Sequence, residues 1–498
     1  MTGVSLGSNL WVITAFALYL GMMIAIGLYS TRFSSSGLGE FFLGGRKMKS
    51  FVVALSAVTA GRSAWLIIGM SGMAYLRGVS AIWAVVGYIL MELFMFVYAG
   101  RRLRIFTGKM DNLTIPDYLE SRLADKTRLV RTVSLIPILI FMVAYVAAQF
   151  TAGGKALSAS FGINPVYGIL ITAGVVLFYT MMGGFLAVCL TDVFQAMFMI
   201  FALVLLPAVA IVRFGGLPLV LATLKGLSPQ LLDPFALSAG AFLGFIGIGF
   251  GSPGNPHILN KYMSIQNPER LRASGLIGTI WNVIMAWGAL YIGLVGRAMY
   301  SDVALLPAKD AENIYPLLGS QHLHPFIFGL TISAIFAAIM STADSQLLVA
   351  SSALIRDIYQ KILAKGKEMT QRQLVFWSRT ATIFIALIAF AIGVYAKKLV
   401  FYMVLFAWGG LGAAFGPAIL LSLYWKRLTK WGVAAGIFIG TAVDIIWYSI
   451  PALKAAVSEW VPATILSGVV VIGVTLLTKA PAGFFPFPYY QNLYPAPT

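Results

Sequence analysis

Gly247-Ile-Gly-Phe-Gly-Ser-Pro-Gly-Asn-Pro256 interrupts an apolar segment that is long enough to cross a membrane. Four of its residues are glycine and two are proline. Proline removes a backbone donor and glycine lowers helix stability, so no continuous helix is expected here. Unpaired backbone at bilayer depth is tolerated only where it lines a protein-enclosed cavity or meets a ligand. The stretch therefore predicts a broken membrane helix at a binding site, with a matching break near Gly61.

The composition is that of a polytopic membrane protein. Of 498 residues, 59% are hydrophobic and only 10% are charged, and the mean hydropathy is +0.88. A bilayer core requires roughly 20 apolar residues per helix. We predict an all-α protein with a single transmembrane domain over residues 1–479 and a disordered cytoplasmic tail over 480–498, rich in Pro, Phe and Tyr. Thirteen segments are expected to span: 9–29, 50–76, 81–100, 132–152, 163–182, 190–212, 237–260, 275–299, 325–353, 375–396, 399–424, 431–450 and 460–478.

The net charge of +18 reflects topology. Most basic residues fall in alternate loops, above all 30–49, 101–131 and 354–374. The positive-inside rule places these loops in the cytoplasm, with the N-terminus outside and the C-terminus cytoplasmic, in the cell membrane. The lipid bilayer is thus the expected partner, and neither nucleic acid nor an obligatory protein partner is predicted.

The sequence also argues against an enzyme. A single cysteine, Cys189, excludes an intrachain disulfide framework and a cysteine-based metal cage. No nucleophile–base pair, phosphate-binding loop or metal cluster is found at membrane depth.

Polar residues in the ninth segment point to a cation. Ser341, Asp344 and Ser345 are spaced i, i+3, i+4 and share one helix face, with Thr342 beside them. Oxygen donors without nitrogen or sulfur suit a hard monovalent cation. The alternative is that these hydroxyls bond to their own backbone or to a neighbouring helix.

Four separated motifs resemble those of the sodium/solute symporter family, whose sodium/proline symporters are the nearest branch. The likeness extends from the first predicted helix to the thirteenth. It implies the leucine-transporter fold: two inverted repeats of five helices, about 50–212 and 237–424, whose broken members are helices 2 and 7. The motifs are Phe42-Leu-Gly-Gly-Arg46, Gly183-Gly-Phe-Leu-Ala-Val188 with Thr191-Asp192, Asn255-Pro-His-Ile-Leu259 and Ser341-Thr-Ala-Asp-Ser-Gln-Leu-Leu-Val349.

The resemblance also implies cation ligands. A sodium ion would lie between helices 2 and 9, held by the carbonyls of Thr59, Arg62 and Ala338 and the hydroxyls of Ser341 and Thr342. A second cation site, which some members of the family have, would map onto Ser341, Asp344 and Ser345, with Asp192 nearby. Asp192 has an alternative role, which is to cap or stabilise the start of helix 6.

The sequence departs from the family pattern at Arg62. Sodium/proline symporters have an aspartate at the position of Gly61 and an uncharged residue at the position of Arg62. Because an unpaired charge within a membrane is costly, Arg62 is predicted to pair with Asp344, and Glu92 is the second candidate. Three roles stay open: a structural ion pair, a guanidinium that replaces one cation and weakens sodium dependence, or a fork that holds a substrate carboxylate.

Solute contacts are expected along the two breaks. The proline branch has two aromatic residues at the positions of Ile248 and Ser252, so proline is not predicted as the substrate. An unwound helix 2 would offer the amides around Ala64 and Trp65 to an anionic group. His257 is expected to be structural rather than a proton carrier. The predicted solute contacts are Ser63, Ala64, Trp65, Ile248, Ser252, Asn255 and Pro256.

The motifs together imply sodium-coupled symport of a small organic solute, an amino acid or a carboxylate, by alternating access. One alternative is a sodium-independent or proton-coupled carrier in which Arg62 replaces a cation. A second is a membrane sensor that binds solute without moving it.

Overall fold

The computed structural model describes residues 9–30, 38–363, 370–396 and 398–479, and these are almost entirely helical. Within this part of the chain the only β-type pairing is an isolated bridge between Met48 and Ile265. The predicted disordered tail, 480–498, lies outside the described residues. The helices that carry the apolar segments are α1 (Leu10–Ser30), α3 (Ser50–Ala64), α4 (Ser71–Arg77), α5 (Trp83–Phe94), α8 (Leu129–Phe161), α9 (Pro165–Phe214), α11 (Ala239–Ile246), α12 (Pro256–Ser264), α13 (Leu271–Met299), α15 (Pro325–Ser352), α16 (Gln371–Tyr395), α17 (Val400–Tyr424), α18 (Lys430–Ser449) and α20 (Trp460–Leu477).

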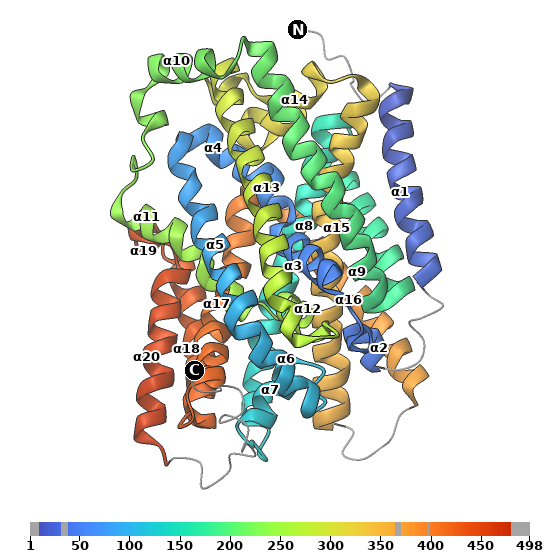
Figure 1. Cartoon of the computed structure of the whole chain (residues 1–498), viewed down its shortest axis with the longest axis vertical. Helices are drawn as coiled ribbons and strands as arrows, with labels where there is room; N and C mark the ends of the chain where they lie inside the picture. The colour runs from blue at the N-terminus through green and yellow to red at the C-terminus, as the bar shows by residue number, and fades with distance from the viewer. Residues whose placement is uncertain (1–8, 31–37, 364–369, 397, 480–498) are drawn as a thin grey trace.

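Shorter helices lie between them, most of them towards the ends of the molecule, while α19 lies at mid-height beside α11 (Figure 1). In this view α10 and α14 lie at the upper end, and α2, α6 and α7 lie in the lower half. These helices are α2 (Leu38–Leu43), α6 (Gly100–Lys109), α7 (Ile115–Arg122), α10 (Leu217–Leu227), α14 (Ile314–His322) and α19 (Pro451–Ala456).

Ten helical stretches in the described residues are long and apolar enough to cross a membrane. One of them, Ser50–Lys109, contains two of the predicted segments, 50–76 and 81–100. Two further predicted segments correspond to the shorter apolar helices Pro165–Phe178 and Ala239–Gly254. The all-α membrane architecture is confirmed, and the number of thirteen crossings stays a prediction.

Two glycines separate predicted segments that are otherwise continuous. Gly78 follows α4 with a φ of 65°, and a Cβ there would lie 2.0 Å from the Leu231 carbonyl oxygen. Gly184 interrupts α9 with a φ of 58° and a ψ of −161°. Only glycine adopts these conformations without strain, so the sequence places both turns.

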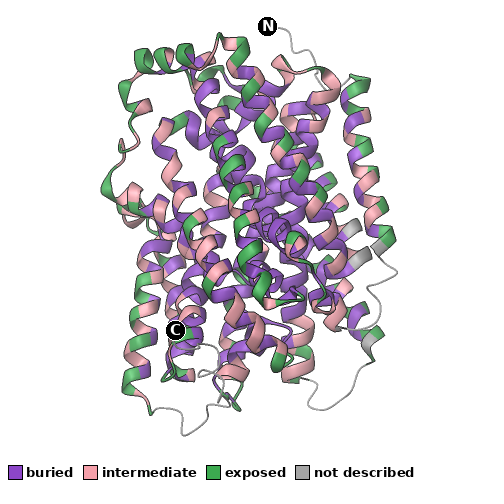
Figure 2. Ribbon diagram, viewed as in Figure 1, coloured by how far each residue is buried: buried purple, intermediate pink, exposed green. Residues whose placement is uncertain are grey.

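The centre of the molecule is formed by α15, in which every residue from Thr331 to Ser352 is buried. It packs against α1, α3, α8 and α9. Figure 2 shows buried residues filling the middle of the bundle and exposed residues on the outer faces of peripheral helices such as α1 and α20. The exposed side chains there are apolar, for example Leu10 at 74% and Leu477 at 89%, as expected for helices that face lipid.

Candidate functional site

The first break lies at Ser63, two residues beyond the predicted position. Ser63 has a φ of 44° and a ψ of −172°, which residues with a side chain rarely adopt, and a wide helical turn, η4 (Trp65–Met70), follows. The Ala64 amide donates to Oε1 of Gln149 on α8 (3.1 Å), and the Trp65 amide donates to Oγ of Ser63 (3.1 Å). Side chains therefore satisfy the backbone at this break. The prediction that these two amides are open to an anion is wrong.

The second break separates α11 from α12, as predicted. Between them η8 (Gly247–Gly254) is a tight 3₁₀ stretch, and Asn255 is extended. Trp408 of α17 donates its indole N–H to the Ile248 carbonyl (2.8 Å). A Cβ on Gly251 would lie 1.8 Å from the same indole nitrogen. A tryptophan from a distant segment thus packs directly against the broken helix.

The hydroxyls of α15 meet the carbonyls of α3. Oγ of Ser341 donates to the carbonyl oxygens of Thr59 (3.3 Å) and Ala338 (3.1 Å), and Oγ1 of Thr342 donates to that of Ala60 (2.9 Å). These are the hydrogen bonds to the same and a neighbouring helix that the alternative predicts, and they also place the hydroxyls beside the predicted sodium-binding carbonyls. Four of the five predicted sodium ligands are therefore brought together. Ala60 joins them, and no property of its side chain could have marked it, because it contributes only a carbonyl.

The fifth predicted ligand, the Arg62 carbonyl, accepts the Trp65 amide. A carbonyl oxygen has two lone pairs, so one is left for an ion. All the candidate ligands in this cluster are neutral oxygens, which is a donor set suited to a monovalent hard cation.

The residues of the predicted second cation site have different partners. Asp192 accepts hydrogen bonds from Oγ of Ser56 and from Nζ of Lys261 (3.0 Å), and the lysine and aspartate side chains are both buried. Lys261, just beyond the predicted segment 237–260, therefore lies inside the bundle on α12 rather than in a loop. Asp344 accepts the amide of Ser345, and its Oδ2 is buried without a hydrogen-bond partner among the described residues.

Arg62 is fully buried and pairs with Glu92, the second of its two predicted candidates, and not with Asp344, the first. Its Nη2 lies 3.0 Å from Oε2 of Glu92 on α5, and its Nε donates to Oδ1 of Asn282 on α13 (2.7 Å). The Asn282 amide also donates to Glu92, and the guanidinium carbon lies 3.3 Å from the centroid of the Tyr88 ring. The predicted pair is wrong because the side chain leaves α3 towards α5 and α13.

The seven predicted solute contacts lie along the two breaks and are all buried. Around them, four polar atoms are buried and have no hydrogen-bond partner among the described residues: Nε1 of Trp65, Nε2 of Gln149, Oγ of Ser252 and Oδ1 of Asn255. Buried polar atoms in folded proteins are nearly always paired. These atoms are therefore candidates to bind a polar ligand or water.

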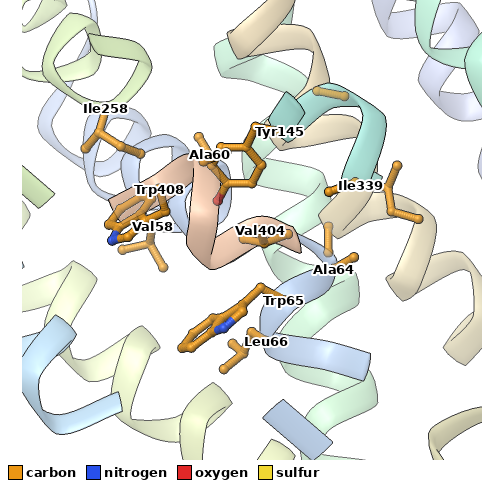
Figure 3. Packing of buried hydrophobic residues seen from close by; sticks show 14 of the residues in the cluster. Val58, Ala60, Ala64, Trp65, Leu66, Tyr145, Ile258, Ile339, Val404 and Trp408 are labelled. Atoms are coloured by element: carbon orange, nitrogen blue, oxygen red, sulfur yellow. The ribbon is translucent and has the colours of Figure 1, made fainter. Parts of the chain in front are cut away.

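Aromatic rings lie against the same breaks (Figure 3). Trp65 stacks on Phe401 with 5.7 Å between ring centroids, and Tyr88 lies 5.0 Å from Trp408. The ring of His257 packs edge-on against Tyr145 at 5.9 Å. The breaks are thus lined by a mixture of aromatic faces and polar atoms, as small-molecule sites usually are.

Four residues that contact the breaks or Arg62 were not predicted from the sequence: Tyr88, Gln149, Asn282 and Trp408. Gln149 had a signal, because a polar side chain within an apolar segment is uncommon. Asn282 had the same signal more weakly. Tyr88 and Trp408 had none, since aromatic residues in membrane helices mostly serve packing or the membrane interface.

Comparison with known proteins agrees with this architecture. A family model described as the sodium:solute symporter family matches residues 41–440. The chain is 38% identical over 464 residues to the high-affinity proline transporter PutP of Bacillus subtilis, covering 92% of this chain and 97% of that protein. It is 34% identical over 484 residues to a sodium/proline symporter of Staphylococcus aureus, covering 94% of this chain and 93% of that protein.

Two solved structures share the fold. A Na⁺-coupled sialic acid symporter, in a substrate-bound outward-open state, superposes with a TM-score of 0.79 at 20% identity and covers 95% of this chain and 99% of that one. MhsT in complex with L-phenylalanine superposes with a TM-score of 0.56 at 14% identity and covers 86% of this chain and 98% of that one. They confirm the predicted leucine-transporter fold.

Proposed function

The chain belongs to the sodium:solute symporter family, and on that premise we propose where its sodium ion and its solute bind. Proteins of this family are transporters, so the chain is a multi-pass membrane carrier that couples sodium to the movement of a small solute, and it is not an enzyme. The predictions of a symporter and of sodium as its coupling ion are confirmed.

Sodium is proposed to bind between α3 and α15. This assignment rests on the contacts between two hydroxyls and three carbonyls. The hydroxyls are those of Ser341 and Thr342, and the carbonyls are those of Thr59, Ala60 and Ala338. An ion at this point bridges the residues before the α3 break to the central helix α15. Sodium binding would thereby order the break and prepare the solute site.

The test is sodium-driven uptake into proteoliposomes by Ser341→Ala and Thr342→Ala. Loss of one ligand is expected to weaken the apparent sodium affinity about tenfold, which corresponds to about 1.4 kcal/mol. The control is Ser333→Ala, because the Ser333 hydroxyl is buried on the same helix but donates only to the Gly329 carbonyl (2.9 Å). An unchanged sodium affinity in both α15 variants would reject the site.

The solute is proposed to be a zwitterionic amino acid held between the two breaks. Nε2 of Gln149 and Nε1 of Trp65 are buried donors suited to a carboxylate, and Oδ1 of Asn255 and Oγ of Ser252 are buried acceptors suited to an ammonium group. The remaining predicted contacts, Ser63, Ala64, Ile248 and Pro256, would shape the cavity.

Proline is the first solute to test. The sequence argued against proline as the substrate, because positions 248 and 252 hold Ile and Ser where the proline branch has aromatic residues. In the structure Trp408 lies against this same segment, so a ring has an aromatic neighbour contributed by α17. The two relatives named as proline transporters support the same choice.

Competition experiments separate amino acids from simple carboxylates. Uptake of labelled proline, driven by sodium and compared with choline, is expected to be inhibited by apolar amino acids and not by monocarboxylates without an amine. Equal inhibition by both classes would contradict recognition of the ammonium group. Inhibition by other amino acids without proline uptake would keep the class and reject proline.

Transport is proposed to follow alternating access, in which one group of helices moves against the other around the two breaks. Coupling requires that the empty and the fully loaded carrier reorient more readily than the carrier with sodium alone. One chain supplies both breaks and the sodium ligands, which supports transport without an obligatory protein partner.

Asp344 and Ser345 remain the candidates for a second cation, because Oδ2 of Asp344 is a buried carboxylate oxygen without a partner among the described residues. Asp192 is the weaker member of this set, since Lys261 already neutralises it. A carrier in which Arg62 replaces the sodium ion has less support, because its guanidinium contacts Glu92 and Asn282 rather than the α3–α15 oxygens. A solute sensor is unexpected in a family of transporters.

We propose that the protein lies in the plasma membrane, with its N-terminus outside the cell and its C-terminus in the cytoplasm. The basic residues of α6, such as Arg101 and Arg102, lie at the end of the molecule opposite to α10 and α14 (Figure 1). Cys189 is buried, so introduced cysteines can be labelled selectively. In intact cells an impermeant thiol reagent is expected to label Gln230→Cys and not Lys126→Cys, and the reverse pattern would invert the topology.

A further inference from the structure

Arg62 occupies a site that is built like a cation site. It lies among groups from two other helices: the Glu92 carboxylate and the Tyr88 ring from α5, and the Asn282 amide oxygen from α13. The Arg62 and Glu92 side chains are 0% and 2% exposed. A carboxylate, an amide oxygen and an aromatic face each attract a monovalent cation.

The hydrogen bonds distinguish the groups that form this site, which come from α5 and α13, from the group that occupies it, which is the Arg62 guanidinium. Asn282 donates its amide to Glu92 and accepts from Arg62, so the α5 and α13 groups also contact each other. Arg62 makes two of its contacts through Nε and Nη2, while its Nη1 is buried without a hydrogen-bond partner among the described residues. Both oxygens of Glu92 thus accept hydrogen bonds, while one nitrogen of the guanidinium that neutralises this carboxylate has none.

This cluster is separate from the proposed sodium site. The carbonyls of Thr59 and Ala60 meet α15, whereas the Arg62 side chain reaches α5 and α13. The positive charge of Arg62 is therefore not delivered to the α15 hydroxyls. It neutralises Glu92, whose burial without a counter-charge would be costly.

We propose that Glu92, Asn282 and Tyr88 form a site for a monovalent cation, distinct from the α3–α15 site and from the Asp344–Ser345 candidate, and that the guanidinium of Arg62 fills it permanently as a tethered ion. The inference rests on the proposed sodium-coupled function. A tethered cation does not leave with the solute. The number of sodium ions transported in each cycle is therefore one fewer than the number of cation sites in the protein. The Glu92 site becomes available to sodium only when the arginine is removed.

The test is Arg62→Met, which keeps most of the length of the side chain and removes its charge. The measurement is solute uptake into proteoliposomes as a function of sodium concentration. We expect uptake at low sodium to fall at least about tenfold, and the Hill coefficient for sodium to rise by about 1 over that of the unmodified protein, because one more ion must bind. Free guanidinium at millimolar concentration should restore part of the uptake at low sodium.

A second variant removes the requirement for the extra ion. In Arg62→Met/Glu92→Gln the carboxylate is neutral, so the Hill coefficient is expected to return to that of the unmodified protein and guanidinium to have no effect. The control is Arg131→Met, which removes another buried arginine that pairs with Asp117, Glu120 and Asp357 away from this site. It should alter stability without changing the steepness of the sodium curve.

Thermal unfolding in sodium, guanidinium and choline tests cation binding even if Arg62→Met transports too slowly to measure. Relative to choline, guanidinium should stabilise Arg62→Met and not the double variant, and sodium should stabilise Arg62→Met more than the double variant, which keeps only the α3–α15 site. An Arg62→Met protein that does not respond to guanidinium, and that sodium stabilises no more than it stabilises the double variant, would overturn the proposal and leave a purely structural ion pair. If the unmodified protein itself shows no sodium dependence, it is the proposed coupling that fails.

Discussion

At the residue scale, Gln149 links the break in α3 to the proposed solute site. Its Oε1 accepts the Ala64 amide, and its Nε2 is a buried donor without a partner among the described residues. One side chain thus compensates the interrupted backbone and presents a donor towards the proposed carboxylate. Such a polar group in a membrane protein interior is expected to serve both stability and binding.

Gln149→Ala is therefore expected to lower both. The Ala64 amide would be left unpaired, which costs about 1–3 kcal/mol of stability, and the KM for solute should rise about tenfold because a charged group loses a hydrogen bond. Thermal unfolding and uptake kinetics measure the two effects. Ser134→Ala is the control on α8, since the Ser134 hydroxyl donates only to the Val130 carbonyl (2.7 Å). Normal kinetics in Gln149→Ala would remove Gln149 from the site.

At the element scale, α17 is held against the second break by a glycine. The indole of Trp408 donates to the Ile248 carbonyl and fills the space above Gly251. The side-chain Nδ2 of Asn255 donates to the Gly251 carbonyl (2.7 Å) and to the Trp408 carbonyl (3.3 Å). The contact between η8 and α17 therefore depends on the lack of a side chain at one position.

Gly251→Ala is expected to displace the tryptophan, because its Cβ would lie 1.8 Å from the indole nitrogen. Overpacking of this kind costs about 1–3 kcal/mol, and the apparent solute affinity should fall at least about tenfold if Trp408 lines the cavity. Uptake kinetics provide the measurement. The matched control is Gly473→Ala on α20, where a Cβ would meet no atom within 4 Å. Equal kinetics in the two variants would place Trp408 outside the solute site.

A second element-scale contact joins α7, α8 and η13 (Ala353–Leu363). Arg131 on α8 binds Asp117 of α7 (2.6 Å) and Asp357 of η13. Burial of Asp117 raises its pKa, but the nearby charges of Arg356 and Arg131 outweigh burial and hold the pKa below its ordinary value of 3.8. Its charge therefore stabilises the folded protein fully above that ordinary value, and the stabilisation is lost as the pH falls through the lower folded-state pKa.

Asp117→Asn should accordingly be destabilised by about 3–5 kcal/mol at neutral pH, because it breaks a buried ion pair. The difference in Tm from the unmodified protein should shrink as the pH is lowered below 3.8. Asp111→Asn is the control, since Asp111 also pairs with an arginine but its side chain is 86% exposed. A Tm difference that does not change with pH would show that the charge of Asp117 is not what matters.

At the scale of the whole molecule, Glu312 ties three separate parts together. It lies in the short helix η12 (Ala311–Asn313) before α14, and its side chain is buried. Its Oε2 is 2.7 Å from Nζ of Lys155 on α8, and its carboxylate accepts the amides of Val400 and Phe401 at the start of α17. A negative charge at a helix N-terminus is favourable, so this residue fixes one end of α17.

Glu312→Ala is expected to loosen this end of the bundle. Removing one partner of a buried pair costs about 3–5 kcal/mol, and residues 300–313 should be cut more readily in limited proteolysis of the purified protein. Asp302→Ala is the control within the same segment, because Asp302 is exposed and accepts only a local amide, that of Ala304. Unchanged Tm and cleavage in Glu312→Ala would show that these contacts do not hold the segment.

Most of the fold could be predicted from the sequence, since it depends on local properties. The length of apolar segments, the alternation of basic loops and the glycines and prolines of residues 247–256 each act where they stand in the chain. The proposed sodium ligands Ser341 and Thr342 could also be named from the sequence, because they belong to a recognisable motif.

For Arg62 the sequence left two candidate partners and for the second break it gave none, and the packing of the helices settled both. Arg62 bonds to Glu92, 30 positions away, and to Asn282, 220 positions away, while Trp408 bonds to Ile248 across 160 positions. Such contacts depend on which way each side chain leaves its helix and on how the helices pack. Spacing along one chain does not encode either property, so Asp344 was a reasonable partner for Arg62 in the sequence and the wrong one in space.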